Sequence, residues 1–429
     1  MKKNINLVHP RDQITSIISR IYSRGMTTTS GGNISIIDDN GDIWVTPSAI
    51  DKGSLRAIDI MCVKKDGTIE GKHKPSSEFP FHKAIYAARP DIKSVIHAHP
   101  PALVSFSIVR KIPNTNVISQ AKHICGPIGY AKYKIPGSND LGGVIADEFK
   151  KGFKAVIMEN HGVVLGGSDL TDAFKRFETL EFCARTILFG SQIGTPTYLT
   201  DDQIDAFEAQ VPSLIPEMET AEFPPDELEK RSEICNIVQR SCEQGLMISS
   251  YGTVSMRWKN DDFLITPTGA NRWDIHIDDI VQVSDGKREQ GKVPSRATWI
   301  HQEIYKRNSK INSIIMTQSP YLMAFGISNS SLNVRTIPES WIFLQDIPAV
   351  AYGKHFKANN SPEILDNCKT ALIVENDSVI ITGDELLQTF DYLEVAEFSA
   401  KSIVLSKSLG DMVPINDAEV EALREKFLS

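Results

Sequence analysis

The sequence contains no long apolar run, and this absence limits where the protein can work. No stretch of the 429 residues reaches the roughly 18–20 apolar residues that a helix needs to cross a bilayer. The first residues, MKKNINLVHPRDQ, contain lysines but no apolar segment of the kind found in a signal peptide. We therefore expect a cytoplasmic protein without a membrane partner.

Paired cysteines and excess basic charge are also missing. The six cysteines are scattered without a Cys-x-x-Cys pair, which argues against a disulfide framework or a zinc ribbon and favours small core residues. The formal net charge is −8, from 46 basic and 54 acidic residues. Nucleic acid is therefore not expected as a partner, because binding to phosphate backbones usually requires a basic surface.

The sequence does contain an internal repeat: two copies of one unit follow each other along the chain. Four motifs recur in the same order at an offset of about 219 residues, so chance is a poor explanation. The matching segments are Thr46–Ala49 with Thr266–Gly269, Lys74–Tyr86 with Val293–Tyr305, Ile92–Phe106 with Ile311–Phe325, and Ala155–Gly162 with Ala371–Ser378. A proline-rich acidic stretch lies between the copies. We predict a first domain over residues 1–210, a linker over 211–227 and a second domain over 228–429.

Within a copy, helical and strand-like patterns alternate, which predicts a layered α/β domain with a mixed sheet. A new helix is expected to begin at about Asp226. In the first copy we expect helices over residues 11–23, 78–88 and 171–189, and strands over 33–37, 43–46, 60–63, 94–99, 155–158 and 163–165.

Four residues of the first copy have the chemistry of a metal site. His97 and His99 alternate at the end of an apolar strand, so both imidazoles are expected on one face. Glu78 follows Pro-Ser-Ser at a helix start, and His161 follows a buried strand. Together they suit a divalent ion, with zinc the first choice. Singly, each also suits a simpler role: a solvated strand face, a carboxylate at a helix N-terminus, or a turn histidine.

The second copy acts as an internal control. Glu78, His97, His99 and His161 are replaced by Ala297, Met316, Gln318 and Asp377, whereas the surrounding apolar residues persist. The joint loss of all four predicts a metal site and catalysis in the first copy only. His82 is kept as His301 and is therefore interpreted as structural, and Asp377 has no evident metal partner in the sequence.

Three loops of the first copy suit an anion or are ordinary caps and turns. They are Ser30–Asn33, Thr46–Ala49, and Ser76-Ser77 at a helix start, where backbone N–H groups are free. The second copy keeps Thr266–Gly269 and Ser295 but has Arg296 in place of Ser77. It either binds an anion or keeps these residues for its turns.

As a set, Ser-Gly-Gly-Asn33, Thr46-Pro-Ser, Pro75-Ser-Ser-Glu78, His97-Ala-His99 and Glu159-Asn-His-Gly162 resemble the class II aldolase/adducin family, especially its L-fuculose-phosphate aldolases. The resemblance covers residues from about 10 to 205 and, in degenerate form, from 228 to 410. It implies a duplicated three-layer α/β/α fold with a mixed, mostly antiparallel sheet. It also implies Zn²⁺, or another divalent metal, on His97, His99 and His161. Glu78 is implied as a metal-site residue and acid/base, with a phosphate pocket of Gly32, Asn33, Ser48, Ala49, Ser76 and Ser77.

The implied activity is retro-aldol cleavage of a ketose phosphate through a metal-stabilised enediolate. Alternatives within the family are a sugar-phosphate 4-epimerase and a 3-oxo-acid-phosphate decarboxylase; an adducin-like interaction module without catalysis is another. Pro113–Gln120 lacks the tyrosine with which the aldolases protonate the leaving aldehyde, whereas Glu78 favours an aldolase over an epimerase, which prefers aspartate. The family forms tetramers, so we expect a homo-oligomer in which two chains form a pseudo-tetramer of domains.

Overall fold

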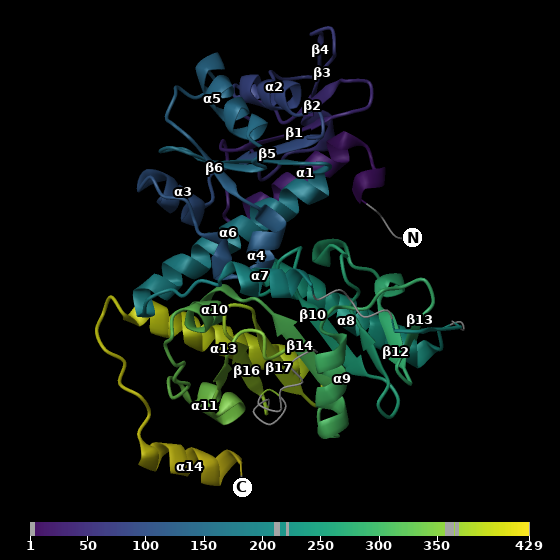
Figure 1. Ribbon diagram of the computed structural model, residues 1–429, viewed down its shortest axis with the longest axis vertical. Helices are drawn as coiled ribbons and strands as arrows, with labels where there is room; N and C mark the ends of the chain where they lie inside the picture. Colours follow the sequence, from purple (N-terminus) through teal and green to yellow (C-terminus); the bar gives the residue numbers. More distant parts are fainter. Residues whose placement is uncertain (1–4, 210–214, 220–222, 357–363, 365–368, 429) are drawn as a thin grey trace. The chain divides into compact units, whose positions relative to one another are not determined.

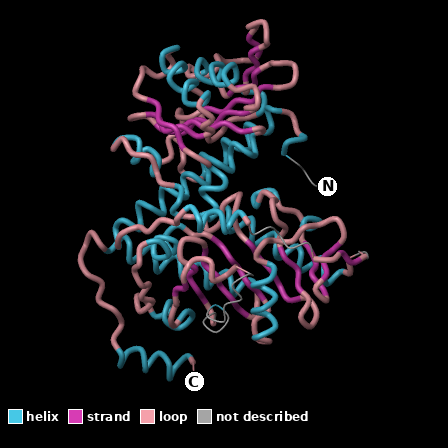
Figure 2. Tube along the Cα trace, in the orientation of Figure 1, coloured by secondary structure: helices cyan, strands magenta, loops and turns pink. Residues whose placement is uncertain are grey.

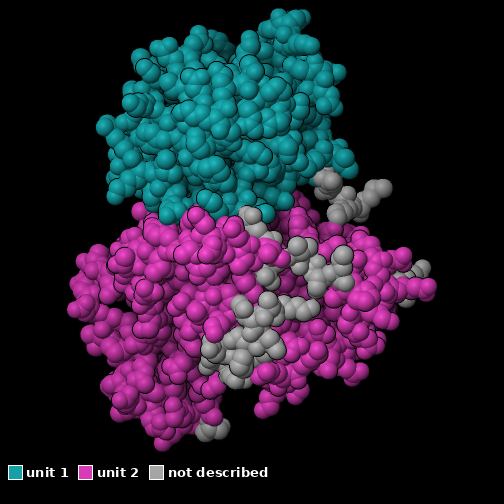
Figure 3. Space-filling model, in the orientation of Figure 1, with its two compact units in different colours: residues 1–115, 121–185 teal, residues 116–120, 186–429 magenta. Residues whose placement is uncertain are grey.

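The computed structural model describes residues 5–209, 215–219, 223–356, 364 and 369–428 (Figure 1). The chain divides into two compact units, coloured separately in Figure 3. Unit 1 comprises residues 1–115 and 121–185, and unit 2 comprises residues 116–120 and 186–429. Within the described ranges, no helix combines the length and the apolar character needed to cross a bilayer. Each unit contains a β-sheet accompanied by helices (Figure 2).

Unit 1 is built on an eight-stranded sheet in the order β4-β3-β2-β1-β5-β8-β7-β6. Neighbouring strands are antiparallel except β6 and β7, which are parallel. The strands are β1 (Asn33–Ile37), β2 (Ile43–Val45), β3 (Met61–Val63), β4 (Ile69–Glu70), β5 (Ser94–Ala98), β6 (Ile128–Ala131), β7 (Ala155–Met158) and β8 (Gly162–Gly167).

Helices lie on both faces of this sheet (Figure 1). The helices of the first half are α1 (Pro10–Ser23), α2 (Phe79–Ala88), α3 (Pro101–Ile108), α4 (Ser119–Cys125), α5 (Asn139–Lys150) and α6 (Leu170–Ile193), with 3-10 turns η1 (Ile5–Leu7), η2 (Ala57–Asp59) and η3 (Thr115–Val117). Helix α1 buries Ile14, Ile17, Ile18 and Ile21, whose spacing forms one apolar stripe. On the other face, α2 and α5 close a core around Phe81, Phe149 and Val95.

Unit 2 repeats this topology with one additional strand. Its order is β15-β16-β17-β14-β10-β11-β12-β13-β9, which matches unit 1 read in reverse, with β9 added at the edge. The strands are β9 (Glu217–Met218), β10 (Thr253–Arg257), β11 (Phe263–Ile265), β12 (Val281–Ser284), β13 (Lys287–Glu289), β14 (Ser313–Thr317), β15 (Ala349–Val350), β16 (Ala371–Val374) and β17 (Ser378–Gly383).

The described helices of unit 2 are α7 (Asp201–Glu208), α8 (Pro225–Gln244), α9 (Thr298–Arg307), α10 (Pro320–Ile327), α11 (Pro338–Leu344), α13 (Leu386–Ser406) and α14 (Asp417–Phe427), with 3-10 turns η4 (Arg272–Asp274) and η5 (Ile277–Asp279). Among them, those from α8 to α13 follow the order of unit 1, and α7 and α14 are additional. Ile300 and Ile304 of α9 pack on strand residues such as Phe263, as α2 does in unit 1. The duplicated, mostly antiparallel α/β fold predicted from the sequence is therefore confirmed.

Several local expectations can be compared with the structure. Strand β5 ends at Ala98, so the prediction that His99 belongs to the strand was wrong by one residue. The structure places β9 and the start of α8 within the predicted linker, residues 211–227, and residues 211–214 and 220–222 of it lie outside the described part of the chain. The described cysteines are buried and free, whereas Cys368 lies outside the described residues.

Candidate metal centre

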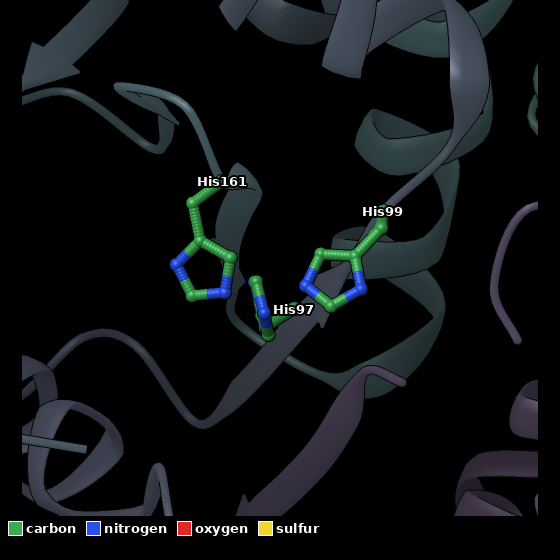
Figure 4. A group of neighbouring side chains, drawn as sticks. All are labelled: His97, His99 and His161. Atoms are coloured by element: carbon green, nitrogen blue, oxygen red, sulfur yellow. The ribbon is translucent and has the colours of Figure 1, made fainter. Parts of the chain in front are cut away.

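Three histidines of unit 1 lie at the end of β5 and in the turn before β8. Their ligand nitrogens all lie within 4.8 Å of one another, and the three imidazoles turn toward one another in Figure 4. His97 is the penultimate residue of β5 and His99 follows the strand. His161 is presented by a turn in which Asn160 adopts a left-handed φ of 53°, a conformation that asparagine tolerates better than most residues. Backbone geometry therefore brings together three residues that are up to 64 positions apart (161 − 97).

A backbone carbonyl sets the orientation of the central histidine. Nδ1 of His97 lies 2.9 Å from the carbonyl oxygen of Val163, on the neighbouring strand β8. Because a carbonyl only accepts, Nδ1 carries the proton, and the lone pair of Nε2 is left for a metal ion. Within the described part of the chain, Nε2 of His97, Nε2 of His99 and Oε1 of Glu78 are buried without a hydrogen-bond partner. Such inward-facing unpartnered atoms fit a divalent cation.

Burial keeps two of these imidazoles in the neutral form that a metal requires. Burial, together with the neighbouring His97 and His161, lowers the pKa of His99 to about 3. The pKa of His161 falls to about 4, again through burial first and His97 second. Both side chains are therefore unprotonated near neutral pH and present a lone pair to a cation.

Glu78 stands beside the histidines at the N-terminus of α2. Its Oε2 lies 3.2 Å from Nε2 of His97, and its Oε1 lies 3.3 Å from Nε2 of His161. Burial alone would raise the pKa of this carboxyl group, but His97, His161 and a hydrogen bond from Asn33 outweigh burial and hold the pKa below its usual range. Glu78 is therefore a carboxylate, the form that accepts a proton.

Asn33 fixes Glu78 through a chain of buried hydrogen bonds that the sequence did not reveal. Nδ2 of Asn33 donates to Oε2 of Glu78 at 2.8 Å, and Oδ1 of Asn33 lies 2.5 Å from Nε2 of His82. Nδ1 of His82 in turn lies 2.7 Å from the hydroxyl of Ser35. Burial lowers the pKa of His82 to about 3, so this ring is neutral. His82 is structural, as predicted, but it also orients the amide that holds Glu78.

The loops predicted to form an anion pocket are joined through their backbones. The N–H of Ser76 donates to the carbonyl of Thr46 at 3.1 Å, and the N–H of Ser48 donates to that of Lys74 at 2.9 Å. Ser76 is buried and its hydroxyl accepts from the N–H of Glu78, whereas Ser77 is exposed. Ala49 holds a left-handed φ of 56° at this turn. These contacts place the two loops beside Glu78.

The glycine of the third loop is needed for a close backbone approach. A Cβ atom on Gly32, whose φ is +70°, would lie 2.9 Å from the carbonyl oxygen of His97. The next residue, Asn33, pairs with His97 in the antiparallel register of β1 and β5. The structure thus brings Gly32 and Asn33 to the metal-site end of the sheet.

The corresponding place in unit 2 has different chemistry. Asp377, which replaces His161, is buried, and its Oδ2 lies 3.1 Å from the hydroxyl of Tyr251 and 3.3 Å from Nε2 of His355. Nε2 of Gln318 donates to the carbonyl of Asp377 at 2.7 Å. Among the described residues, the three histidines of unit 1 form the cluster with metal-ligand spacing, and unit 2 contributes no such cluster.

A comparison with known protein families agrees with the duplicated fold. The family model "Class II Aldolase and Adducin N-terminal domain" matches residues 12–188 and again residues 232–404. The chain therefore belongs to this family and contains two tandem copies of its domain.

The individual relatives are named as different enzymes. A 5-deoxy-D-ribulose 1-phosphate aldolase of Bacillus thuringiensis is 32% identical over 202 residues, which are 46% of this chain and 92% of the relative. A 3-oxo-tetronate 4-phosphate decarboxylase of Haemophilus influenzae is 32% identical over 44% of this chain and 90% of its own length. An L-fuculose phosphate aldolase of Methanocaldococcus jannaschii is 34% identical over 42% of this chain and 95% of its own length. These relatives divide between aldolases and a decarboxylase.

Proposed function

We propose that the domain predicted over residues 1–210 is a metal-dependent aldehyde-lyase that cleaves a ketose phosphate by retro-aldol chemistry, in the manner of an L-fuculose-phosphate aldolase. The observation that carries this proposal is the cluster of His97, His99 and His161 with the carboxylate of Glu78 beside it. The aldolases among the relatives support the same reaction class. We expect the second domain, residues 228–429, to have no catalytic activity of its own.

His97, His99 and His161 would hold the divalent ion, and an all-imidazole donor set favours Zn²⁺. When bound, the ion supplies Lewis-acid stabilisation of the negative charge that develops on the substrate's carbonyl oxygen. The protein's own contribution is to orient His97 through its hydrogen bond to Val163 and to keep His99 and His161 neutral by burial.

Glu78 would move the proton in this reaction. Its carboxylate accepts the proton from the hydroxyl group whose carbon becomes the leaving aldehyde, or returns one to the carbon where the bond has broken. Asn33 keeps the carboxylate in place through its hydrogen bond to Oε2. The loops around Gly32, Ser48, Ala49, Ser76 and Ser77 would bind the phosphate, so that binding energy from a remote group orients the reacting atoms.

Decarboxylation of a 3-oxo-acid phosphate is the second candidate. It leaves an electron pair on a carbon next to a carbonyl group, as the retro-aldol step does, but it releases CO₂ and forms no aldehyde, so it requires no group that exchanges a proton with an aldehyde oxygen. Residues 113–120 contain no tyrosine, and a 3-oxo-tetronate 4-phosphate decarboxylase is among the relatives. Both observations favour this reaction as the alternative.

A substrate panel separates the two reactions. The full chain, loaded with Zn²⁺, is incubated with ketose 1-phosphates and with 3-oxo-acid phosphates, while dihydroxyacetone phosphate and CO₂ are measured. Release of dihydroxyacetone phosphate from a ketose phosphate is the expected result. Release of CO₂ from a 3-oxo-acid phosphate, without cleavage of any ketose phosphate, would replace the aldolase by the decarboxylase; dihydroxyacetone phosphate counts for the aldolase only when it comes from a ketose phosphate, since a four-carbon 3-oxo-acid phosphate also leaves it after losing CO₂. No product from either class would contradict both.

The metal site has its own test, which needs no substrate. His99→Gln introduces the residue that unit 2 carries at this position, so the backbone is expected to tolerate it. Removal of one ligand should weaken zinc binding more than the roughly 10- to 100-fold loss caused by changes to supporting residues. Competition with a chromogenic chelator measures this affinity. His73→Gln, which removes a histidine of the same unit outside the cluster, is the control and should bind zinc as the unchanged chain does.

A further inference from the structure

Each copy ends in a further repeated segment, beyond the four motifs found from the sequence. Residues 190–207 correspond to residues 406–423 at an offset of 216, the offset that also relates Ala155–Gly162 to Ala371–Ser378. We call these two segments the first arm and the second arm. Each contains a short helix, α7 or α14, whose N-terminus carries a capping box. The arms are therefore equivalent pieces of the two copies.

The two arms are attached in the same way. The N–H of Leu199, which precedes the cap of α7, donates to the carbonyl of Asn116 at 2.9 Å. The N–H of Ile415, which precedes the cap of α14, donates to the carbonyl of Arg335 at 3.0 Å. Asn116 and Arg335 are themselves equivalent, at the offset of 219 that relates the earlier motifs. The contacts of the first arm are therefore a guide to those expected of the second.

The first arm belongs to unit 2, where it covers one stretch of chain. The N–H of Thr197 donates to the carbonyl of Ile327 at 2.6 Å. A Cβ atom on Gly194 would lie 2.5 Å from the carbonyl oxygen of Ser328, so the two backbones approach each other closely. Ile327 and Ser328 are accordingly 0% and 3% exposed.

Helix α7 of the first arm lies against residues of unit 2 that correspond to the edge of the metal centre. The hydroxyl of Tyr352 donates to the carbonyl of Gln203 at 3.3 Å. The guanidinium of Arg296, which replaces Ser77 of unit 1, lies 4.4 Å from the centre of the Phe207 ring. The first arm therefore borders the place where unit 2 has lost the metal ligands.

The equivalent surface of unit 1 is exposed. Ile108 and Val109 are the counterparts of the two residues that the first arm covers, but they are 55% and 57% exposed. Tyr133 is the counterpart of Tyr352 in the register of β6 and β15, and it is exposed as well.

The loop that carries Tyr133 borders the candidate metal centre. The N–H of Tyr133 donates at 2.9 Å to Oε2 of Glu159, in the turn that carries His161. Further along the loop, a Cβ atom on Gly137 would lie 2.8 Å from the carbonyl oxygen of Ser77, beside the start of α2. A partner seated on this loop would therefore lie next to the candidate metal centre.

The exposed surface of unit 1 has side chains that the second copy lacks. It consists of residues 108–112 and 132–135, which we call the rim and which are all exposed. The rim contains four basic residues beside isoleucine, valine and tyrosine, whereas its counterparts, residues 327–331 and 351–354, contain one basic residue. Exposed apolar side chains among basic ones suit a protein partner that is both apolar and acidic.

The second arm has these properties. Its Leu409 and Val413 are each 89% exposed. Helix α14 carries four acidic and two basic residues, and Val420 is the one buried residue among its eleven. Figure 1 shows α14 at the end of an extended segment that leads away from α13. The second arm is therefore exposed, although its equivalent, the first arm, is packed on unit 2.

We propose that the second arm of one chain covers the rim of a second copy of this chain, in the way that the first arm covers the corresponding surface of unit 2. By this equivalence, the N–H of the partner's Val413 bonds to the carbonyl of Ile108, and the partner's α14 lies beside Tyr133 and Ser77. Each chain offers one second arm and one rim, so two chains satisfy both. The proposal does not depend on the activity proposed for the first domain.

Light scattering coupled to size exclusion, over a dilution series of the full chain, measures this association. The unchanged chain is expected to have the mass of two chains. Val413→Glu changes an exposed residue, so the fold should be kept. It should raise the dissociation constant at least about tenfold, because an unpaired charge is costly to bury in an interface.

Ile69→Glu is the matched control. It places the same charge at an exposed isoleucine of β4, at the opposite edge of the sheet from β6, and should leave the association unchanged. An unchanged chain that is monomeric would overturn the proposal, and so would a Val413→Glu chain that associates as tightly as the unchanged one.

A disulfide trap shows to which chain the arm on the rim belongs. The equivalent backbone bond, from Thr197 to Ile327, implies Cα atoms about 5–6 Å apart, within the range that a disulfide can bridge. Ile108→Cys combined with Val413→Cys, oxidised with copper phenanthroline, should therefore give a covalent dimer on a non-reducing gel. Ile69→Cys combined with Val413→Cys should stay at the mass of a single chain. A disulfide formed within one chain, or none at all, would contradict the assignment of the arm to a second copy.

Discussion

At the residue scale, the candidate site depends on hydrogen-bond partners that set the tautomer or the orientation of a few polar side chains. The carbonyl of Val163 accepts a hydrogen bond from Nδ1 of His97 and so determines which ring nitrogen carries the proton. The side-chain amide of Asn33 donates a hydrogen bond to Glu78 and so holds its carboxylate in position. Val163 belongs to no motif, and Asn33, although part of the Ser-Gly-Gly-Asn33 motif, was predicted from the sequence only as a phosphate-pocket residue and not as a partner of Glu78. The second copy makes their role visible: Thr253 replaces Asn33 where Ala297 replaces Glu78, and its hydroxyl turns instead to Ser295, 2.6 Å away. Asn33, which holds the carboxylate, and Glu78, which provides it, are therefore both replaced in the second copy.

Exchange of Asn33 for the residue of the second copy tests this dependence. Asn33→Thr removes the hydrogen bond to Glu78, and a hydrogen bond to a charged group contributes about 1.5–3 kcal/mol. We expect kcat/KM to fall roughly 10- to 100-fold, because each 1.4 kcal/mol corresponds to about a factor of ten. Zinc affinity should change far less than in His99→Gln, since the three histidines remain.

The reciprocal exchange, Thr253→Asn, is the matched control. It changes the same pair of residue types in unit 2 and should leave kcat/KM at the value of the unchanged chain. If Asn33→Thr released the zinc as completely as His99→Gln, Asn33 would be a support of the metal cluster and not of Glu78 alone.

At the element scale, one buried carboxyl group, that of Glu181, connects α6 to the helix that follows the candidate metal site. Oε2 of Glu181 accepts from the N–H of Leu103 at 3.1 Å, and Oε1 accepts from that of Ala102 at 3.4 Å, at the start of α3. Glu397 does the same for α10 in unit 2. The repeat keeps this contact in the half that has lost the metal cluster, so it is a structural cap on a helix N-terminus.

The cap makes the stability of the protein depend on pH. Burial raises the pKa of Glu181 to about 7, although Arg185 and the two N–H groups act in the opposite direction. The folded state therefore keeps a proton that the unfolded chain loses from about pH 4.5 upward. The contribution of this group to stability is full below that pH and is lost as pH rises toward 7.

Glu181→Gln removes this titration. From pH 5 to 7 we expect the stability of the variant to rise relative to that of the unchanged chain by up to about 1.4 kcal/mol per pH unit. Thermal unfolding followed by circular dichroism at several pH values measures the difference. Glu243→Gln, at an exposed position of α8, is the control. A constant difference between Glu181→Gln and the unchanged chain across this range would show that Glu181 does not titrate there.

The sequence predicted most elements because their patterns are local. Ile14, Ile17, Ile18 and Ile21 identify α1 by spacing alone, and the apolar run before His97 identifies β5. Comparison of the two copies singled out the histidines without any structure. The hydrogen bonds of Asn33 and the carbonyl of Val163 could not be foreseen, because they join segments far apart in the chain. Asp377 was unexplained for the same reason: His355 lies in a segment without a recognisable repeat partner.

At the scale of the whole molecule, the duplication predicts how many chains assemble. The family resemblance implies four domains in an assembly, and each chain of this protein provides two. Unit 2 exposes three apolar side chains on α13, which we call the α13 stripe although Asp391 and Lys401 lie between them: Leu387, Phe398 and Leu405 are 62%, 68% and 56% exposed. Their spacing of 11 and 7 residues places all three on one face of the helix. Exposed apolar side chains that line up in this way are typical of protein–protein contacts.

We therefore expect the full chain to be a dimer in solution and α13 to contribute to the interface. Light scattering coupled to size exclusion should give about twice the mass of one chain. Phe398→Glu places a charge in the centre of the stripe and should shift the protein toward the monomer, because an unpaired charge is costly to bury in an interface. Thr68→Glu adds the same charge at an exposed polar site of unit 1 and should leave the dimer intact. A full chain that is monomeric and fully active would refute the pseudo-tetramer, whereas a dimer unaffected by Phe398→Glu would place the interface on another face.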